Sequence, residues 1–198
     1  RRIIGFTETF EAGGGEILFV SHSADPSEAV QKTNDYMTAY GDTDCIYATG
    51  EDYITHAADV IKSRGITDCK IYGSNISPSV CQLIMDGQVE ACTGGEFVCG
   101  SLAVTLLINY LDGNPIKDAD GTAPYFDNLT QFMVTAENAE DFYEFLSDEN
   151  LATHTISDEE YQNLLVRNNP DVDYDYFYDF LTNYEENVYA KVEANAAQ

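Results

Sequence analysis

The sequence predicts an α/β fold: an open, mostly parallel sheet with helices on both faces, followed by a helical tail. Up to residue 138, short apolar runs alternate with segments whose apolar residues recur at helical spacing. Residues 45–75 show strand, helix and strand, and a single helix of this length joins parallel neighbours through a right-handed crossover. After residue 138 the strand-like runs stop, and an acidic, aromatic tail begins.

The composition fits a globular protein and argues against two classes of partner. The chain has 198 residues, of which 44% are hydrophobic, so it can bury a substantial core. Its 9 basic and 35 acidic residues give a formal charge of -26, which argues against nucleic acid and against an anionic membrane surface. Because no run of about 18 apolar residues is present, we expect no membrane insertion in this segment.

The first elements are predicted from apolar runs and capping residues. Residues 1–12 are expected to form a helix that ends at the glycines of residues 13–15, and residues 16–22 the first strand. Asp25 and Pro26 then suit the N-cap and the first position of a helix. The expected core face of this helix contains Val30, Thr33, Met37 and Tyr40.

The central unit has the clearest boundaries. Residues 45–48 and 69–73 are expected strands. The helix between them begins at Glu51 and Asp52, whose charges complement the positive end of the helix dipole, and Gly65 is placed to cap its other end. Its expected apolar stripe contains Tyr53, Ile54, Ala57, Ala58 and Ile61.

The later elements complete the predicted lobe and add the tail. They are expected in the order helix 76–87 with Ser77 as its N-cap, strand 89–95, helix 97–112, loop 116–130 and strand 131–138, then helical segments at 139–148, 151–171 and 172–196. The helix at 97–112 is expected to face inward with Leu102, Ala103, Leu106, Leu107, Tyr110 and Leu111. We therefore predict an α/β lobe at residues 1–138 and a helical C-terminal extension at residues 139–198.

The expected functional edge carries polar residues but no catalytic motif. Ligands of such sheets collect at the carboxyl ends of the strands, which here are residues 49–52 and 74–75. The histidines are scattered, and no serine lies in a G-x-S-x-G motif, so we expect no catalysis, no cofactor and no metal. The five cysteines lack a CxxC spacing, so buried free thiols are expected, with one disulfide left as an alternative.

Six short motifs occur in an order and spacing that resemble one protein family. They are RIIGF at 2–6, TDCIYA at 43–48, CKIYGSN at 69–75, MDGQVEA at 85–91, GSLAV at 100–104 and FMVTAEN at 132–138. Together they resemble the carboxy-terminal lobe of type I periplasmic binding proteins, in the sugar-binding group related to ribose- and galactose-binding proteins. The resemblance covers about 135 residues and includes no amino-terminal lobe.

The resemblance implies a solute-binding component of an ABC-type importer, which closes two lobes on a sugar or a similar small polar molecule. The chain would be one jaw of this clamp, beginning just past the first hinge crossing. The implied partners are the ligand and the transporter permease, and the implied location is extracytoplasmic, in the periplasm or as a lipoprotein at the cell surface. Two alternatives are the effector-binding lobe of a LacI-type transcription regulator and a binding lobe that has become a protein-interaction module.

The resemblance also implies three ligand-binding residues. Arg2 matches an arginine that hydrogen-bonds sugar hydroxyls, and its fork suits two hydroxyls at once. Glu51 matches the acidic member of a family Asn-Asp pair whose Asn is Gly50 here, and Asn75 matches a ligand-binding Asp. A glycine, Gly94 or Gly95, replaces a family Gln. The alternatives are structural: a surface terminus for Arg2, a first-turn acid for Glu51 and a turn residue for Asn75.

Overall fold

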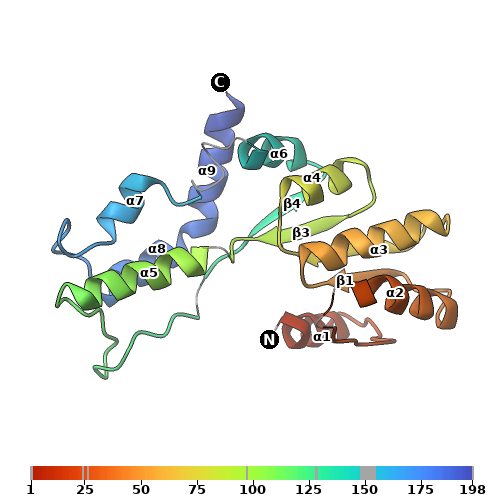
Figure 1. Ribbon diagram of the computed structural model, residues 1–198, viewed down its shortest axis with the longest axis horizontal. Helices are drawn as coiled ribbons and strands as arrows, with labels where there is room; N and C mark the ends of the chain where they lie inside the picture. Colours follow the sequence, from red (N-terminus) through yellow and green to blue (C-terminus); the bar gives the residue numbers. More distant parts are fainter. Residues whose placement is uncertain are drawn as a thin grey trace. The chain divides into compact units, whose positions relative to one another are not determined.

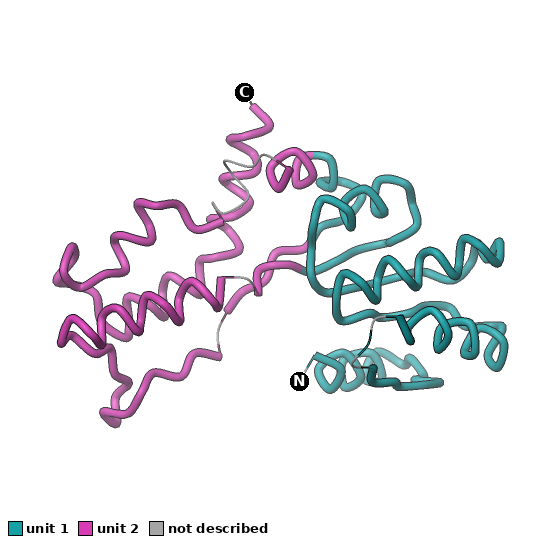
Figure 2. The backbone as a smooth tube through the Cα atoms, viewed as in Figure 1, with its two compact units in different colours: residues 1–93, 134–140 teal, residues 94–133, 141–198 magenta. Residues whose placement is uncertain are grey.

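The computed structural model describes residues 2–23, 25, 27–96, 98–127, 129–147 and 155–197. The chain divides into two compact units, residues 1–93 with 134–140, and residues 94–133 with 141–198 (Figure 2). Each unit is described by itself below. The sequence-based boundary at residue 138 concerns where the family-like lobe ends, and it remains a prediction.

The first unit is built on a sheet with parallel pairing (Figure 1). The strand order is β1-β2-β3-β4, and both β1 with β2 and β2 with β3 pair in parallel. This confirms the predicted open α/β fold class. The elements in chain order are α1 (Arg2–Ala12), α2 (Ser27–Ala39), β1 (Cys45–Ala48), α3 (Glu51–Ser63), β2 (Lys70–Ser74), α4 (Pro78–Met85), β3 (Ala91–Gly94, whose last residue belongs to the second unit) and β4 (Phe132–Thr135, whose first two residues belong to the second unit).

Helix α3 begins and ends as its sequence predicts. Beyond its last residue, Gly65 adopts φ +65°, and the N–H of Ile66 donates to the carbonyl oxygen of Ile61 at 3.1 Å, which is a Schellman cap. Its face toward the sheet is buried, and Ile54 is fully buried. A Cβ placed on Gly73 of β2 would lie 2.4 Å from Cδ1 of Ile54, so helix and strand approach so closely that only glycine fits.

The predicted strand at residues 16–22 is wrong. These residues have no regular secondary structure, and Leu18, Phe19 and Val20 are 42%, 50% and 46% exposed. The run is apolar enough for a buried strand, but a strand also needs a hydrogen-bonded neighbour. Within the described residues, positions 16–21 make no backbone hydrogen bond.

The core face predicted for α2 is partly wrong. Thr33 and Met37 are buried as expected, together with Ala29. Val30 and Tyr40 are 37% and 39% exposed. The buried stripe therefore includes Ala29 in place of Val30, and it ends at Met37.

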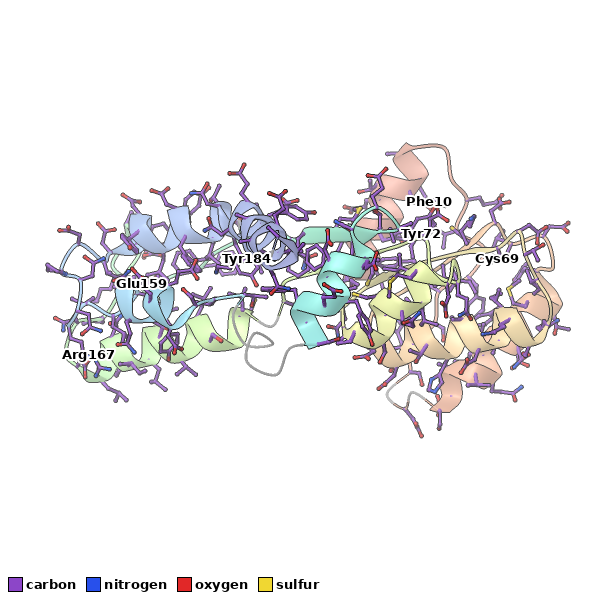
Figure 3. The ribbon with its side chains drawn as sticks, turned by 90° about the horizontal axis from the view of Figure 1, so that it is seen from above. Phe10, Cys69, Tyr72, Glu159, Arg167 and Tyr184 are labelled. Atoms are coloured by element: carbon purple, nitrogen blue, oxygen red, sulfur yellow. The ribbon has the colours of Figure 1, made fainter. Side chains whose placement is uncertain are left out.

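The second unit contains the remaining helices. They are α5 (Val98–Leu111), α6 (Ala139–Ser147, whose first two residues belong to the first unit), α7 (Asp158–Asn163), α8 (Tyr174–Thr182) and α9 (Tyr184–Ala196). The aromatic residues of the tail pack inward only in part: Phe177 and Tyr184 are fully buried, with Tyr184 marked in Figure 3, whereas Tyr178 is 40% exposed. The predicted helix at 151–171 is confirmed only as α7, and residues 151–154 of it lie outside the described residues.

The inward face predicted for α5 is largely wrong. Leu107, Tyr110 and Leu111 are 54%, 65% and 71% exposed, whereas Asn109 is fully buried. The Asn109 amide spans two backbone groups, donating to the carbonyl oxygen of Leu164 and accepting from the N–H of Val166, both at 2.9 Å. Because α5 is apolar nearly all round, hydrophobicity alone could not select its buried face, and this polar bridge marks the face that is buried.

The structure was searched for membrane-spanning helices and for metal-binding clusters among the residues it describes. Among the residues it describes, no helix has both the length and the apolar character needed to cross a membrane, and no group of three or more His, Cys, Asp or Glu side chains could hold a metal.

All five cysteines are free thiols. Burial raises the pKa of Cys69 to about 11 and that of Cys81 to about 12, so both thiols stay protonated and unreactive near neutral pH.

We expect Gly73→Ala to destabilise the protein by about 1–3 kcal/mol, because the added methyl group would overlap the buried Ile54 side chain. The measurement is the free energy of unfolding in urea. The control is Gly5→Ala in α1, where nothing lies within 4 Å of the added Cβ, and this change should be neutral or stabilising. Equal effects of the two substitutions would contradict the close packing of α3 on β2.

We expect Asn109→Leu to cost about 2–4 kcal/mol, because it leaves the Leu164 carbonyl and the Val166 N–H without partners in a buried place. Thr105→Val is the matched control, since Thr105 is also fully buried on α5 but, among the described residues, its hydroxyl bonds only to Ser101 of its own helix. It should cost less than about 1 kcal/mol. Urea unfolding of both variants measures these losses of stability. A loss in Asn109→Leu no larger than that in Thr105→Val would contradict the hydrogen-bonded bridge.

Candidate functional site

The candidate site lies at the carboxyl edge of the sheet in the first unit. Strand β1 ends at Ala48 and α3 begins at Glu51, while β2 ends at Ser74 and α4 begins at Pro78. Because β1 and β2 are parallel and in register, both turns emerge at the same edge. The beginning of α1 reaches this edge too, through Arg2.

Arg2 joins the ends of β1 and β2. Its Nη1 donates to the carbonyl oxygen of Thr49 at 2.9 Å and to Oγ of Ser74 at 3.3 Å. Ser74 is 2% exposed, so its hydroxyl gains a charged partner in a nearly dry place. These contacts hold the guanidinium at the strand ends.

Glu51 is oriented by the neighbouring turn. Its Oε1 accepts a hydrogen bond from Oγ of Ser77 at 2.6 Å, and the same Oγ accepts from the N–H of Val80 as the N-cap of α4. The second carboxylate oxygen, Oε2, has no hydrogen-bond partner among the described residues. The first turn of α3 has no side-chain cap either, so its N–H groups are open to a ligand oxygen at this edge.

Asn75 follows β2 in a strained backbone conformation. Its φ is +104°, and it is the one non-glycine residue with positive φ in the described part of the chain. Its N–H donates to the carbonyl oxygen of Thr93 at 2.8 Å, and its own carbonyl accepts from Sγ of Cys92 at 3.2 Å. The backbone is thus held by β3, while the half-buried side-chain amide has no hydrogen bond within the described residues. Such strain is typical of functional positions.

Gly50, and Gly95 of the pair Gly94 and Gly95, both lie against an aromatic ring. A Cβ on Gly50 would lie 3.3 Å from the Tyr53 ring, whose hydroxyl donates to the carbonyl oxygen of Ser23 at 2.7 Å. Gly95, in the second unit, has φ +121°, and its Cβ would lie 3.2 Å from the Tyr184 ring. A side chain at either position would disturb aromatic packing, so the replacements fit the local structure.

The structure adds residues that the sequence did not mark as part of the site. Ser74 and Ser77 were predicted only as a strand end and a helix cap, yet their hydroxyls fix Arg2 and Glu51. The contacts join residues 72 and 26 positions apart, so no local pattern could reveal them. Together the edge offers a guanidinium, a carboxylate and an amide, all of which hydrogen-bond neutral polar ligands.

The comparison with protein families shows to which family the chain belongs. Residues 1–115 match the model of the periplasmic binding protein domain. The chain belongs to this family. No curated protein sequence matches the chain.

Solved structures of periplasmic binding proteins share the fold. A galactofuranose-binding protein has a TM-score of 0.61 at 20% identity, covering 76% of this chain and 51% of that protein. The arabinose ABC transporter component from Shewanella sp. ANA-3, bound to L-arabinofuranose, gives 0.62 at 18%, covering 76% and 50%. A Caulobacter myo-inositol-binding protein gives 0.59 at 19%, covering 71% and 48%. The chain thus spans about half the length of these proteins.

We expect Ser77→Ala to destabilise this periplasmic-binding-protein domain by about 1 kcal/mol, because the substitution removes the N-cap of α4 and the partner of Glu51. Ser77→Thr keeps the hydroxyl and should cost a few tenths of a kcal/mol. Urea unfolding measures both. Ser77→Ala should cost less stability when Glu51→Gln is already present, because the two side chains share a hydrogen bond. If the losses of the two single variants simply add in the double variant, the coupling between the turns that carry Glu51 and Ser77 is contradicted.

Proposed function

We propose that the chain binds a sugar or a similar small polar molecule at this edge, and that it serves as the solute-binding component of an ABC-type importer. The observation that carries the proposal is the convergence of Arg2, Glu51 and Asn75, from three separate segments, on one edge of a parallel sheet. Membership of the periplasmic binding protein family supports it.

The chemistry of the edge suits hydroxyl groups. A carboxylate oxygen accepts a hydrogen bond from a hydroxyl, the guanidinium of Arg2 donates hydrogen bonds to hydroxyl oxygens, and the amide of Asn75 can do both. A neutral ligand that presents several hydroxyls can use all three. Because the amide of Asn75 brings no charge to its position, it accepts from a hydroxyl more weakly than the carboxylate of the family Asp would.

The partner and the location follow from the same proposal. A component of this kind delivers its ligand to a transporter permease and acts outside the cytoplasm, in the periplasm or anchored at the cell surface. We expect this edge to bind its ligand without catalysis. We expect this chain alone to bind weakly, because it covers only about half the length of its structural relatives and so supplies only part of the contacts to a ligand.

The test is calorimetric titration of the chain with a panel of pentoses, hexoses and inositols. We expect millimolar binding of at least one compound, and a roughly 10–100-fold loss in Glu51→Gln, which removes a charged hydrogen-bond acceptor. The matched control is Asp52→Asn, which removes the neighbouring first-turn acid of α3 and leaves the edge intact. It should keep the affinity.

Two outcomes would contradict the proposal. Equal losses in Glu51→Gln and Asp52→Asn would assign Glu51 to the helix dipole alone. The absence of saturable binding to any sugar or inositol would favour the interpretation of the domain as a protein-interaction module. In either case the fold, judged by circular dichroism, must match that of the unmodified chain.

A further inference from the structure

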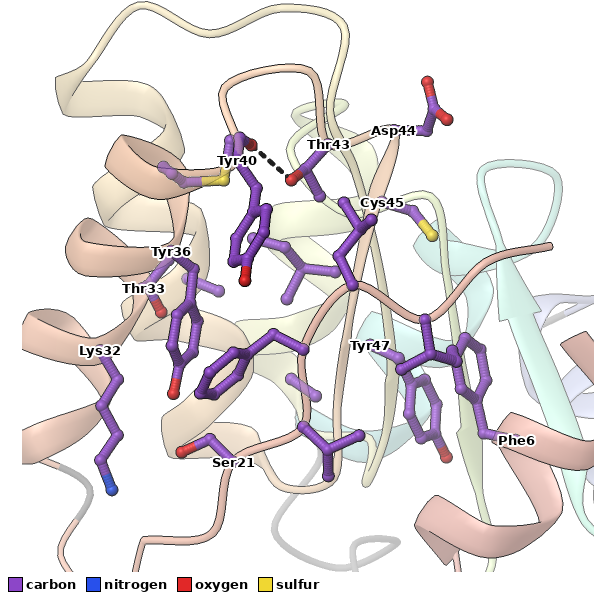
Figure 4. A pocket seen from close by; sticks show the side chains of 18 of the residues that line it. Phe6, Ser21, Lys32, Thr33, Tyr36, Tyr40, Thr43, Asp44, Cys45 and Tyr47 are labelled. Carbon is purple, nitrogen blue, oxygen red and sulfur yellow. Dashed lines mark hydrogen bonds between the residues drawn. The ribbon is translucent and has the colours of Figure 1, made fainter. Parts of the chain in front are cut away.

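Two features of the structure lie outside the candidate site. One is a cavity of about 870 Å³ in the first unit, between residues 14–23, α1, α2 and β1. Figure 4 shows it from close by, with Tyr47 of β1 stacked on Phe6 of α1. Residues 18–20 border the cavity, which is why these apolar side chains are exposed. The other feature lies in the second unit, where α9 contacts the segments that connect the two units.

The chain passes between its two units at three connections, after residues 93, 133 and 140 (Figure 2). Any movement of one unit relative to the other has to take place at these connections, because a hinge is a short stretch of backbone that absorbs the change in φ and ψ. The contacts of the chain beside each connection therefore decide how freely the units move. On the side of the second unit, α9 makes contacts beside all three.

The ring of Tyr184, the first residue of α9, packs beside the first two connections. Tyr184 is fully buried. Its ring lies against Gly95, just after the first connection, where an added Cβ would be 3.2 Å from the ring. On another side, the centroid of the same ring lies 6.5 Å from that of Phe132, just before the second connection. One buried side chain of α9 thus packs between two connecting segments.

Tyr189 holds the second and the third connection. Its hydroxyl accepts from the N–H of Met133 at 2.8 Å and lies 3.0 Å from the carbonyl oxygen of the same residue, to which it donates. Met133 is the last residue before the second connection. The Tyr189 ring also meets Phe142, just after the third connection, edge-on with centroids 6.0 Å apart. A side chain of α9 thus satisfies the two backbone groups that a neighbouring strand would otherwise pair.

Thr130 fixes the beginning of α9 to the strand that leads to the second connection. No side chain of the helix's own N-cap residue caps α9. Instead, the hydroxyl of Thr130 accepts from the N–H of Glu185 at 3.0 Å and supplies the missing cap. The same hydroxyl lies 3.2 Å from the carbonyl oxygens of Leu181 and Thr182, at the end of α8. The strand is therefore bonded to the junction of α8 and α9.

The connecting segments also pack on one another within the second unit. The rings of Phe132 and Phe142 stack with centroids 5.1 Å apart, and both side chains are fully buried. An added Cβ on Gly95 would lie 3.7 Å from the Phe132 ring. Residues beside all three connections thus meet in one aromatic cluster, which Tyr184 and Tyr189 of α9 complete.

Little backbone is left to act as a hinge between α9 and the sheet. Strand β3 ends at Gly94, and the next residue, Gly95, already lies against Tyr184. In β4, Met133 is bonded to Tyr189, and the strand continues without a break past the second connection. Because a hinge needs residues whose φ and ψ angles are free to change, the contacts with α9 leave few residues for one.

We propose that α9 is a clasp, formed by Tyr184 and Tyr189, that holds the three connecting segments together and restricts the movement of one unit relative to the other. With the clasp in place, the segments bend only as a set, whereas without it each bends on its own. The C-terminal extension, which lies outside the residues that resemble the family, thereby acquires a role in the movement between the units. The clasp acts whether or not a ligand is bound, so it does not depend on the proposed function.

The test measures the distance between the units in solution without any ligand. Nitroxide labels replace two exposed side chains, Asp59 of the first unit and Glu159 of the second, through ketone-bearing residues that leave the native thiols unlabelled. Double electron–electron resonance gives the distribution of distances between the labels. We expect the double substitution Tyr189→Phe and Thr130→Val to widen this distribution at least about twofold, because the connecting segments then bend separately.

Amide exchange locates the effect, and a matched tyrosine controls for it. The N–H of Met133 should exchange about tenfold faster in Tyr189→Phe, because it loses its hydrogen-bond acceptor. Exchange in residues 70–74 of β2 should stay unchanged. The control is Tyr176→Phe in α8, since Tyr176 is also half-buried but its hydroxyl makes no hydrogen bond among the described residues. It should alter neither the exchange nor the distance distribution.

Three outcomes would overturn the proposal. An equally narrow distribution in the double variant and in the unmodified chain would show that α9 does not restrict the movement. A lower urea midpoint at unchanged width would make Tyr189 and Thr130 purely structural. Equal widening in Tyr176→Phe would assign the effect to a general loosening of α8 and α9. Since the distances are measured without ligand, a failure to bind sugars would leave each of these results unaffected.

Discussion

The close contact between Ile54 of α3 and the glycine of β2 is the constraint on which the first unit depends. A strand covered this tightly must present no side chain at Gly73, and the register then sets Ala48 of β1 beside it. The helix cannot shift along the strands without opening a void under Ile54. As a result, the turns at both ends of α3 have fixed positions, and one of these turns carries Glu51.

The candidate site depends on this constraint for its geometry. Glu51 lies in the first turn of α3, and Ser77 caps α4 after the neighbouring strand. Their hydrogen bond therefore forms only while β1 and β2 keep their relative positions. Arg2 spans the same two strand ends from a third direction. A change in the packing of α3 therefore reaches the site by moving Glu51 relative to Ser77, although Ile54 contacts no ligand.

The sequence predicted elements whose signals are local, and it missed contacts that are not. The caps of α3 and α4 involve neighbouring residues, so Gly65 and Ser77 were predicted correctly. The buried face of α5 depends on backbone groups 55 and 57 residues away from Asn109, which no periodicity reveals. The site was predicted as a set of strand ends, but the hydroxyl of Ser74, which helps to hold Arg2, was recognised only in the structure.

The failed strand at residues 16–22 has a different cause from the misplaced face of α5. Its composition is that of a strand, and what it lacks is a neighbour, because β1 lies across a cavity. This cavity and the candidate site share one element, α1, which places Phe6 against Tyr47 in the cavity wall and Arg2 at the strand ends. The arginine at the site is therefore only as well fixed as the wall of the cavity that α1 forms.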